Sequence, residues 1–232
     1  MNIRSLWCLR KELLSLLEVT IRISGDQSSL NIFHTLTKPH PKYRLIQNKR
    51  WGVALLPLPD TFELYLRGRH MQNVRTGRSN ARKQGFRFSS INPYEHLQEI
   101  LSVNASLQNR QGRPIRPDYL SIERLKHFFD GKPAIFGILN GDGILRAYAD
   151  TPVCGEVFLF SRLLGHGEDL DKGIMYLLLT EVIRQMIDRK RTHGTPLWAM
   201  YDIFFGGSDG LRTFKSNLGF KPYNVKWLWK PC

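Results

Sequence analysis

A glycine-rich run near the C-terminus has the form that a nucleophilic serine needs. Residues 206–210 read GGSDG, which matches the G-x-S-x-G pattern of serine hydrolases and falls between an expected strand and an expected helix. A hydrolase of that kind carries its acid and then its histidine after the serine, whereas the last histidine here is His193. We therefore interpret Gly206 and Gly207 as a tight turn at a helix start, where free N–H groups can hold an anion or a carbonyl oxygen.

A second candidate site is a basic segment that contains no acidic residue. Between Glu63 and Glu95 the chain carries arginines and lysine but neither aspartate nor glutamate. Arg75, Arg78 and Arg82 are three and four residues apart, so a helix places them on one face, where like charges repel. Without local acids to neutralise them, these arginines favour a surface that binds the phosphates of a donor substrate. A solvated helix face is the alternative interpretation.

A third candidate is the loop before the clearest predicted helix. An apolar strand over 156–164 is followed by Lys172 and by Gly173, which opens a helix with an apolar inner face. Such a loop can present a cation and free backbone N–H groups to a pyrophosphate. The pattern therefore assigns Lys172 and Gly173 to donor binding, although every strand-loop-helix unit has such N–H groups.

Composition limits the kind of partner. The chain has 232 residues, 42% of them hydrophobic, and a formal net charge of +14. This excess indicates an anionic partner such as nucleic acid, a phosphate-rich cofactor, an acidic carrier protein or a membrane surface. Cys8, Cys154 and Cys232 form no disulfide or zinc pattern, so we expect reduced thiols, no metal and a cytoplasmic protein. No apolar run reaches the roughly 18 residues that a membrane span needs.

The order of the expected elements indicates a mixed α/β fold. Residues 1–42 are predicted as an N-terminal extension with helical and strand elements, and residues 43–232 as a single domain. The order β-β-β-α-β-α-β in its second half predicts one central mixed sheet, in which the strands on either side of the long helix are adjacent and parallel. Helices are expected at 60–84, 173–189 and 211–217, and strands at 51–58, 86–91, 134–139, 144–149, 156–164, 197–204 and 225–229.

The C-terminal segment resembles a known enzyme family. The run from Tyr201 to Tyr223, YDIFFGGSDGLRTFKSNLGFKPY, is similar to the C-terminal signature of the Fem-type peptidoglycan-bridge aminoacyltransferases. That signature has a Tyr-Asp pair, a Gly-Gly turn and a Phe-Lys pair followed by a glycine. It is matched here at Tyr201, Asp202, Gly206, Gly207, Phe214, Lys215 and Gly219. Residues 66–85 resemble the arginine-rich helix of the same family.

The resemblance implies a fold and also shows two departures. Fem proteins belong to the acetyltransferase-like (GNAT) superfamily, so the resemblance implies an acyl-CoA N-acyltransferase-like fold. Fem enzymes are substantially longer and have two such domains, whereas this chain has room for one domain and an extension. The superfamily's coenzyme A loop usually reads Q/R-x-x-G-x-G/A, whereas residues 170–175 read LDKGIM. The side chain of Met175 is expected to crowd a pyrophosphate, which argues against ordinary acetyl-CoA binding.

The resemblance also implies roles for individual residues. Lys215 matches the family lysine that stabilises charge on the reacting carbonyl or the leaving oxygen. Asp202 is expected to accept or orient the proton of the amine, with a cap or a salt bridge as its alternative role. Tyr201 is a candidate acid towards the leaving group, with core packing as the alternative. We expect Lys215, Asp202 and the Gly206–Gly207 turn to converge near the ends of the strands that flank the long helix.

Three functions stay open at this point. The first, which we prefer because it dominates the superfamily, is acyl transfer to an amine from a pantetheine thioester on acyl-CoA or an acidic acyl carrier protein. The second is aminoacyl transfer from an aminoacyl-tRNA, which the arginines and the altered loop favour. The third is a non-enzymatic module that binds nucleic acid or a protein partner. None of the three requires a covalently bound cofactor.

Overall fold

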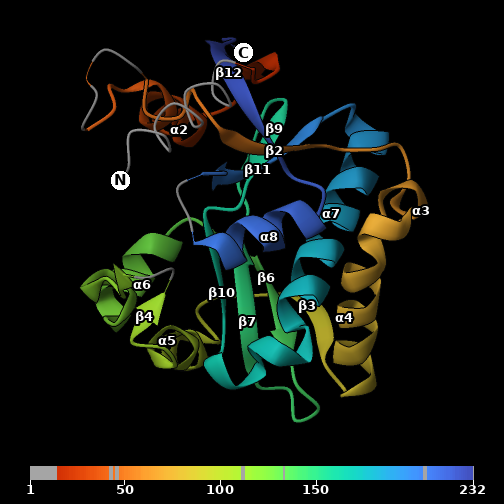
Figure 1. Ribbon diagram of the computed structural model, residues 1–232. Coiled ribbons are helices and arrows are strands. Elements are labelled where there is room, and N and C mark those ends of the chain that lie inside the picture. Colours follow the sequence, from red (N-terminus) through yellow and green to blue (C-terminus); the bar gives the residue numbers. More distant parts are fainter. Residues whose placement is uncertain are drawn as a thin grey trace, which may run out of the picture. The chain divides into compact units, whose positions relative to one another are not determined.

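The chain forms two compact units, each with its own sheet (Figure 1). The structure is a computed structural model that describes residues 15–41, 44, 47–110, 113–132, 134–205 and 208–231. Unit 1 consists of Met1–Leu58, Val153–Leu159 and Arg189–Cys232. Unit 2 consists of Pro59–Pro152 and Phe160–Asp188.

Unit 1 contains a six-stranded mixed sheet with the strand order β1-β12-β2-β11-β9-β8. β9 is parallel to β11 and β1 is parallel to β12, whereas β2 is antiparallel to both β11 and β12. Val53, Ala54 and Leu55 are consecutive residues of β2 and all completely buried, so both faces of this strand are covered. The strands are β1 (Glu18–Ile23), β2 (Val53–Pro57), β8 (Val153–Cys154), β9 (Val157–Leu159), β11 (Trp198–Ile203) and β12 (Lys221–Trp229).

Helices α2 and α8 belong to the same unit as this sheet. Helix α2 (Gln27–Thr37) is capped by Asp26, whose side chain accepts a hydrogen bond from the backbone N–H of Ser29. Its apolar residues, including the buried Leu36, join the core of unit 1. Helix α8 (Asp209–Asn217) lies between β11 and β12 in the sequence and carries Lys215.

Unit 2 contains a four-stranded antiparallel sheet with the order β10-β7-β6-β3. Residues of α5 and α6 pack with this sheet in one core, for example Val103 and Phe129 against Tyr148. Helices α4 and α7 lie side by side (Figure 1). The strands are β3 (Arg87–Ile91), β6 (Ile135–Leu139), β7 (Leu145–Asp150) and β10 (Arg162–Gly165), with a small separate pair, β4 (Asn109–Arg110) and β5 (Arg113–Pro114). The helices are α3 (Phe62–Tyr65), α4 (Gln72–Lys83), α5 (Leu97–Ala105), α6 (Ile122–Phe129) and α7 (Ile174–His193), whose last residues from Arg189 belong to unit 1, with 3₁₀ turns at Arg69–Met71, Pro117–Tyr119 and Gly167–Lys172.

The predicted mixed α/β class is confirmed, but the prediction of one central sheet is wrong. The strand expected at 156–164 is two strands, because its first part, β9, pairs with β11 and its second part, β10, pairs with β7. The chain changes partners at Phe160 and Ser161, which belong to neither strand. The strands expected to be parallel on either side of the long helix are β9 and β11, and their parallel register runs from Val157 opposite Trp198 to Leu159 opposite Met200.

The predicted N-terminal extension contains β1 and α2, while residues 1–14 lie outside the described residues. A domain boundary between residues 42 and 43 stays a prediction. Among the helices that the structure describes, none combines the length and the apolar composition needed to cross a membrane.

Candidate functional site

Lys215 is a buried cation on helix α8. Ser208 precedes the helix and caps it, because its hydroxyl accepts a hydrogen bond from the N–H of Leu211. The helix is followed by Gly219, which has a φ of +86° and lets the chain turn back into β12. One face of α8 is directed inward and buries Lys215 until only 2% of the residue is exposed.

The ammonium group of Lys215 is held by a carbonyl and an aromatic ring. Its Nζ donates a hydrogen bond of 2.8 Å to the carbonyl oxygen of Ile203 and lies 4.6 Å from the ring centroid of Tyr201. In the part of the chain that the structure describes, no carboxylate forms an ion pair with it. Burial lowers the pKa of Lys215 to about 8; the attraction of Asp202 opposes this shift and the repulsion from Lys49 adds to it.

Asp202 occupies a bulge at the end of β11. The register between β11 and β2 shifts between Met200 and Ile203, so two residues of β11 face one residue of β2. Asp202 has a φ of +52°, a left-handed conformation that aspartate tolerates better than most residues. Its side chain is 60% exposed and forms an ion pair with Lys49. The bulge therefore directs the carboxylate outward, beside the ion-pairing lysine.

Tyr201 is a further residue of the C-terminal signature. Tyr201 is buried, its ring packs edge-on against Phe220 at 5.8 Å between centroids, and burial raises the pKa of its hydroxyl. These contacts match the packing role expected as the alternative for Tyr201. Gly206 and Gly207 lie outside the described residues. Lys49 lies beside these residues through its ion pair with Asp202. No motif around Lys49 in the sequence predicts that it belongs to the site.

The three predicted phosphate-binding arginines are engaged within unit 2. Arg78 and Arg82 on α4 each donate to one oxygen of Glu181 on α7, with N–O distances of 2.6 Å. Glu181 is only 1% exposed and also pairs with Arg184 at 2.6 Å. Arg75 donates instead to the carbonyl oxygens of Leu66 and Gly68 and to the side chain of Gln72. For Arg78 and Arg82 the premise that no acid neutralises them is therefore wrong, because α7 supplies Glu181. Phosphate binding by the three arginines stays a prediction.

Gly173 is a packing position. It precedes α7 with a φ of +84°, and a Cβ placed on it would overlap the carbonyl group of Gly77 on α4. Conversely, a Cβ on Gly77 would lie 2.5 Å from the ring of Tyr176 on α7. The two glycines thus allow the backbones of α4 and α7 to approach closely. This contact lies beside the start of α7, where the sequence interpretation placed a pyrophosphate.

Two solved structures have a similar fold at low sequence identity. L-PGS from Bacillus licheniformis has a TM-score of 0.51 at 18% identity, over 73% of this chain and 57% of that protein. FemX has a TM-score of 0.54 at 12% identity, over 74% of this chain and 59% of that protein. The chain has a GNAT-like acyltransferase fold.

The fold implied by the Fem-type resemblance is therefore confirmed. No protein-family model and no curated protein sequence matches this chain. The chain spans less than two thirds of the length of either solved protein, at 57% and 59%.

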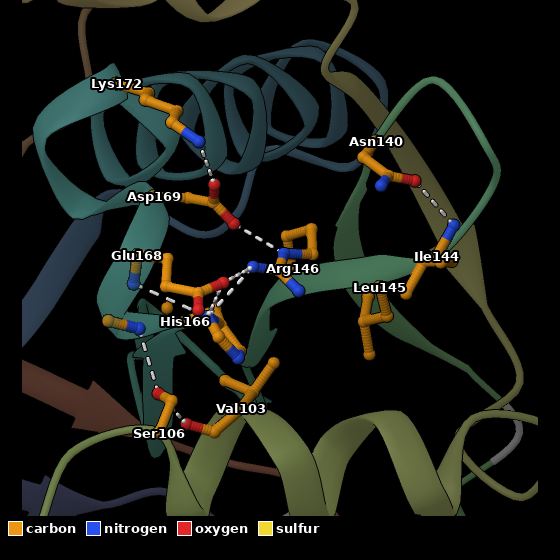
Figure 2. Close-up of polar contacts among 12 residues, drawn as sticks. Val103, Ser106, Asn140, Ile144, Leu145, Arg146, His166, Glu168, Asp169 and Lys172 are labelled. Carbon is orange, nitrogen blue, oxygen red and sulfur yellow. Dashed lines mark hydrogen bonds and ion pairs between the residues drawn. The ribbon is translucent and has the colours of Figure 1, made fainter.

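Lys172 belongs to an ionic network in unit 2 of this GNAT-like fold (Figure 2). Its Nζ donates to Asp169 at 2.6 Å, and the other oxygen of Asp169 accepts from Arg146. Arg146 also pairs with Glu168 at 2.9 Å and contacts the ring of His166. These cations keep the pKa of the buried Asp169 carboxyl below its usual value although burial opposes them.

A polar pocket of about 420 Å³ borders this network. Its charged lining consists of two cations, Arg146 and Lys172, and three carboxylates, Asp142, Glu168 and Asp169. A cavity in which carboxylates outnumber cations repels phosphate. Donor binding by Lys172 and Gly173 stays a prediction, and the observed contacts give each of them a structural role.

The close approach of α4 and α7 leads to a stability prediction. Gly173→Ala is expected to lower the free energy of unfolding by about 1–3 kcal/mol more than Gly143→Ala, because only the first adds a backbone clash to the left-handed strain. Gly143 is the matched control, since its φ is +81° and a Cβ on it would meet nothing within 4 Å. Urea unfolding of the two variants measures the difference, and equal losses would contradict the packing role.

Proposed function

We propose that this protein is an N-acyltransferase in which Lys215 is the catalytic cation. The observation that carries the proposal is the ammonium of Lys215, which is buried without a carboxylate in ion-pair contact among the described residues. A cation held in this way is stabilised further by any negative charge that develops beside it. The proposal is supported by the GNAT-like fold and by the match of Lys215 to the lysine of the Fem-type signature.

The proposed reaction is direct transfer of an acyl group to an amine. The amine nitrogen attacks the acyl carbonyl, a C–N bond forms, and the carbonyl oxygen becomes an oxyanion that Lys215 stabilises. When the tetrahedral intermediate collapses, the bond from carbon to the leaving sulfur or oxygen breaks. The exposed carboxylate of Asp202 is proposed to accept the amine proton, which finally reaches the leaving group.

The choice of donor is also a proposal. Pantetheine thioesters are one class, and their coenzyme A form carries a pyrophosphate that normally needs free N–H groups at a helix start. The start of α7 packs closely against Gly77, and residues 170–175 depart from the coenzyme A pattern, which together favour the second class, the aminoacyl ester of a tRNA, over acyl-CoA. An acyl carrier protein has a single prosthetic phosphate and is not disfavoured by this contact.

The donor is tested by offering each class to the same enzyme. Purified protein is incubated with radiolabelled acetyl-CoA, with an acetylated acyl carrier protein or with total tRNA charged with labelled amino acids, together with a mixture of amines. We expect transfer of label to an amine from charged tRNA or the carrier protein, and loss of this transfer in Lys215→Met. Transfer at the same rate with Lys215→Met, from whichever donor, would refute the role of the lysine.

The lowered pKa of Lys215 predicts opposite trends for activity and stability. A catalytic ammonium is lost as the pH rises through about 8, so the rate falls above that pH. The unfolded chain keeps its proton up to the usual lysine pKa of about 10.4, so it binds more protons than the folded protein above pH 8 and stability rises there. Rate profiles and urea unfolding at pH 7 to 10 measure both trends. Lys215→Arg keeps its charge over this range, so it should show neither the fall in rate nor the rise in stability. If the rate instead rises through pH 8, and does so only when Lys215 is present, the lysine acts as a base.

A further inference from the structure

A second pocket, of about 520 Å³, lies in unit 2 beside α6 and β10, away from the ionic network of Lys172. Its lining combines cations with aromatic rings. The residues are Arg116, Asp118, Tyr119, Arg124, His127, Phe128, Ser161 and Arg162. The volume is in the range of cavities that bind small molecules.

Arg162 is the central cation of this pocket. It is the first residue of β10 and is only 8% exposed. Its guanidinium carbon lies 3.4 Å from the ring centroid of Phe128 and 4.3 Å from that of Tyr119. Its Nη1 is buried and has no hydrogen-bond partner among the described residues. An arginine sandwiched by aromatic rings in this way is held in one orientation.

Arg162 also lacks a counter-ion. Asp150 stands opposite it in the register of β7 and β10, but the carboxylate of Asp150 pairs with Lys132 at 2.8 Å. Lys132 in turn lies 3.8 Å from the centroid of the Phe128 ring, so two cations flank one aromatic side chain. Cation–π contacts offset only part of the cost of burying a guanidinium. The charge of Arg162 is therefore left for a ligand to neutralise.

The remaining charges match a doubly negative group. Asp118 is the acidic residue of the lining, and it pairs with Arg116 at 2.6 Å. Arg124 has no ion-pair partner within the described chain, which leaves Arg124 and Arg162 as two uncompensated cations at one cavity. A phosphate monoester carries close to two negative charges at neutral pH and accepts hydrogen bonds from guanidinium groups. The rings of Tyr119 and Phe128 offer an apolar surface to the rest of such a molecule.

We propose that this pocket binds a phosphate ester of a small molecule, with Arg162 and Arg124 holding the phosphoryl group. The proposal rests on unit 2 alone and does not depend on acyl transfer by Lys215. The pocket exceeds the size of a single phosphate, so it has room for an organic portion beside the aromatic side chains. Ser161, in the turn between β9 and β10, adds a hydroxyl to the lining.

The test uses phenyl phosphate as a probe in titration calorimetry and thermal unfolding of the whole protein. Wild-type protein should bind phenyl phosphate at least tenfold more tightly than inorganic phosphate, and should not bind phenol at the same concentrations. Arg162→Met removes the charge but keeps an apolar side chain on the rings. Its Tm without ligand should equal or exceed that of the wild type, and phenyl phosphate should no longer raise it.

A pair of exposed variants on α6 provides the control. Arg124 lines the pocket, whereas Lys126 lies two residues away on the same helix and does not. Arg124→Gln should weaken phenyl phosphate binding at least tenfold, while Lys126→Gln should leave it within twofold of the wild type. Equal effects of both variants would show general attraction to a basic surface and would overturn the proposal. Absence of phenyl phosphate binding to the wild type would overturn it as well.

Discussion

Lys215→Met is expected to lower turnover by about a hundredfold or more, because a cation aimed at a developing oxyanion contributes a few kcal/mol to its stabilisation. The same substitution should leave the free energy of unfolding unchanged or raise it at pH 7. Methionine fills a similar space, and the cost of burying a charge without a carboxylate partner is removed. Steady-state rates and urea unfolding of one preparation measure both effects.

The control for this prediction is Lys221→Met, which makes the same change at the exposed first residue of β12. Its turnover should stay within twofold of the wild type. A Lys215→Met protein that is well folded and nearly as active as the wild type would reduce Lys215 to a structural lysine. If Lys215→Met fails to fold, the pH profile of Lys215→Arg tests instead whether Lys215 is catalytic.

Glu181→Gln is expected to lower the free energy of unfolding by about 3–5 kcal/mol, the usual cost of removing one member of a buried charge cluster. The substitution keeps the shape of the side chain but leaves Arg78, Arg82 and Arg184 without their shared carboxylate. Arg78 is the least exposed of the three, so its repulsion from the others is the least screened by water. Urea unfolding measures the loss.

Two further variants separate the cluster from a general effect of charge. Glu95→Gln, at an exposed position, should change the free energy of unfolding by no more than about 0.5 kcal/mol. Adding Arg78→Gln to Glu181→Gln should recover part of the loss, because one uncompensated cation is removed. A loss of less than about 1 kcal/mol in Glu181→Gln would mean that water or ions replace the carboxylate easily.

Patterns within a few residues of the sequence determined the local structure. The strands expected at 134–139 and 144–149 correspond to β6 and β7, and the apolar periodicity after Gly173 predicted α7. The run from Tyr201 to Tyr223 implied the GNAT-like fold that the solved structures share. Each of these signals depends on neighbours along the chain, which is why composition and spacing were enough to find them.

Only the tertiary structure decided which charges meet. Glu181 lies 103 residues from Arg78 and 99 from Arg82, so no local pattern indicated that it neutralises them. In the same way, the change of sheet after β9 depends on which strands pair, and the role of Gly173 depends on Gly77. Electrostatic and packing partners are selected by distance in space, whereas helix and strand patterns are set by separation along the chain.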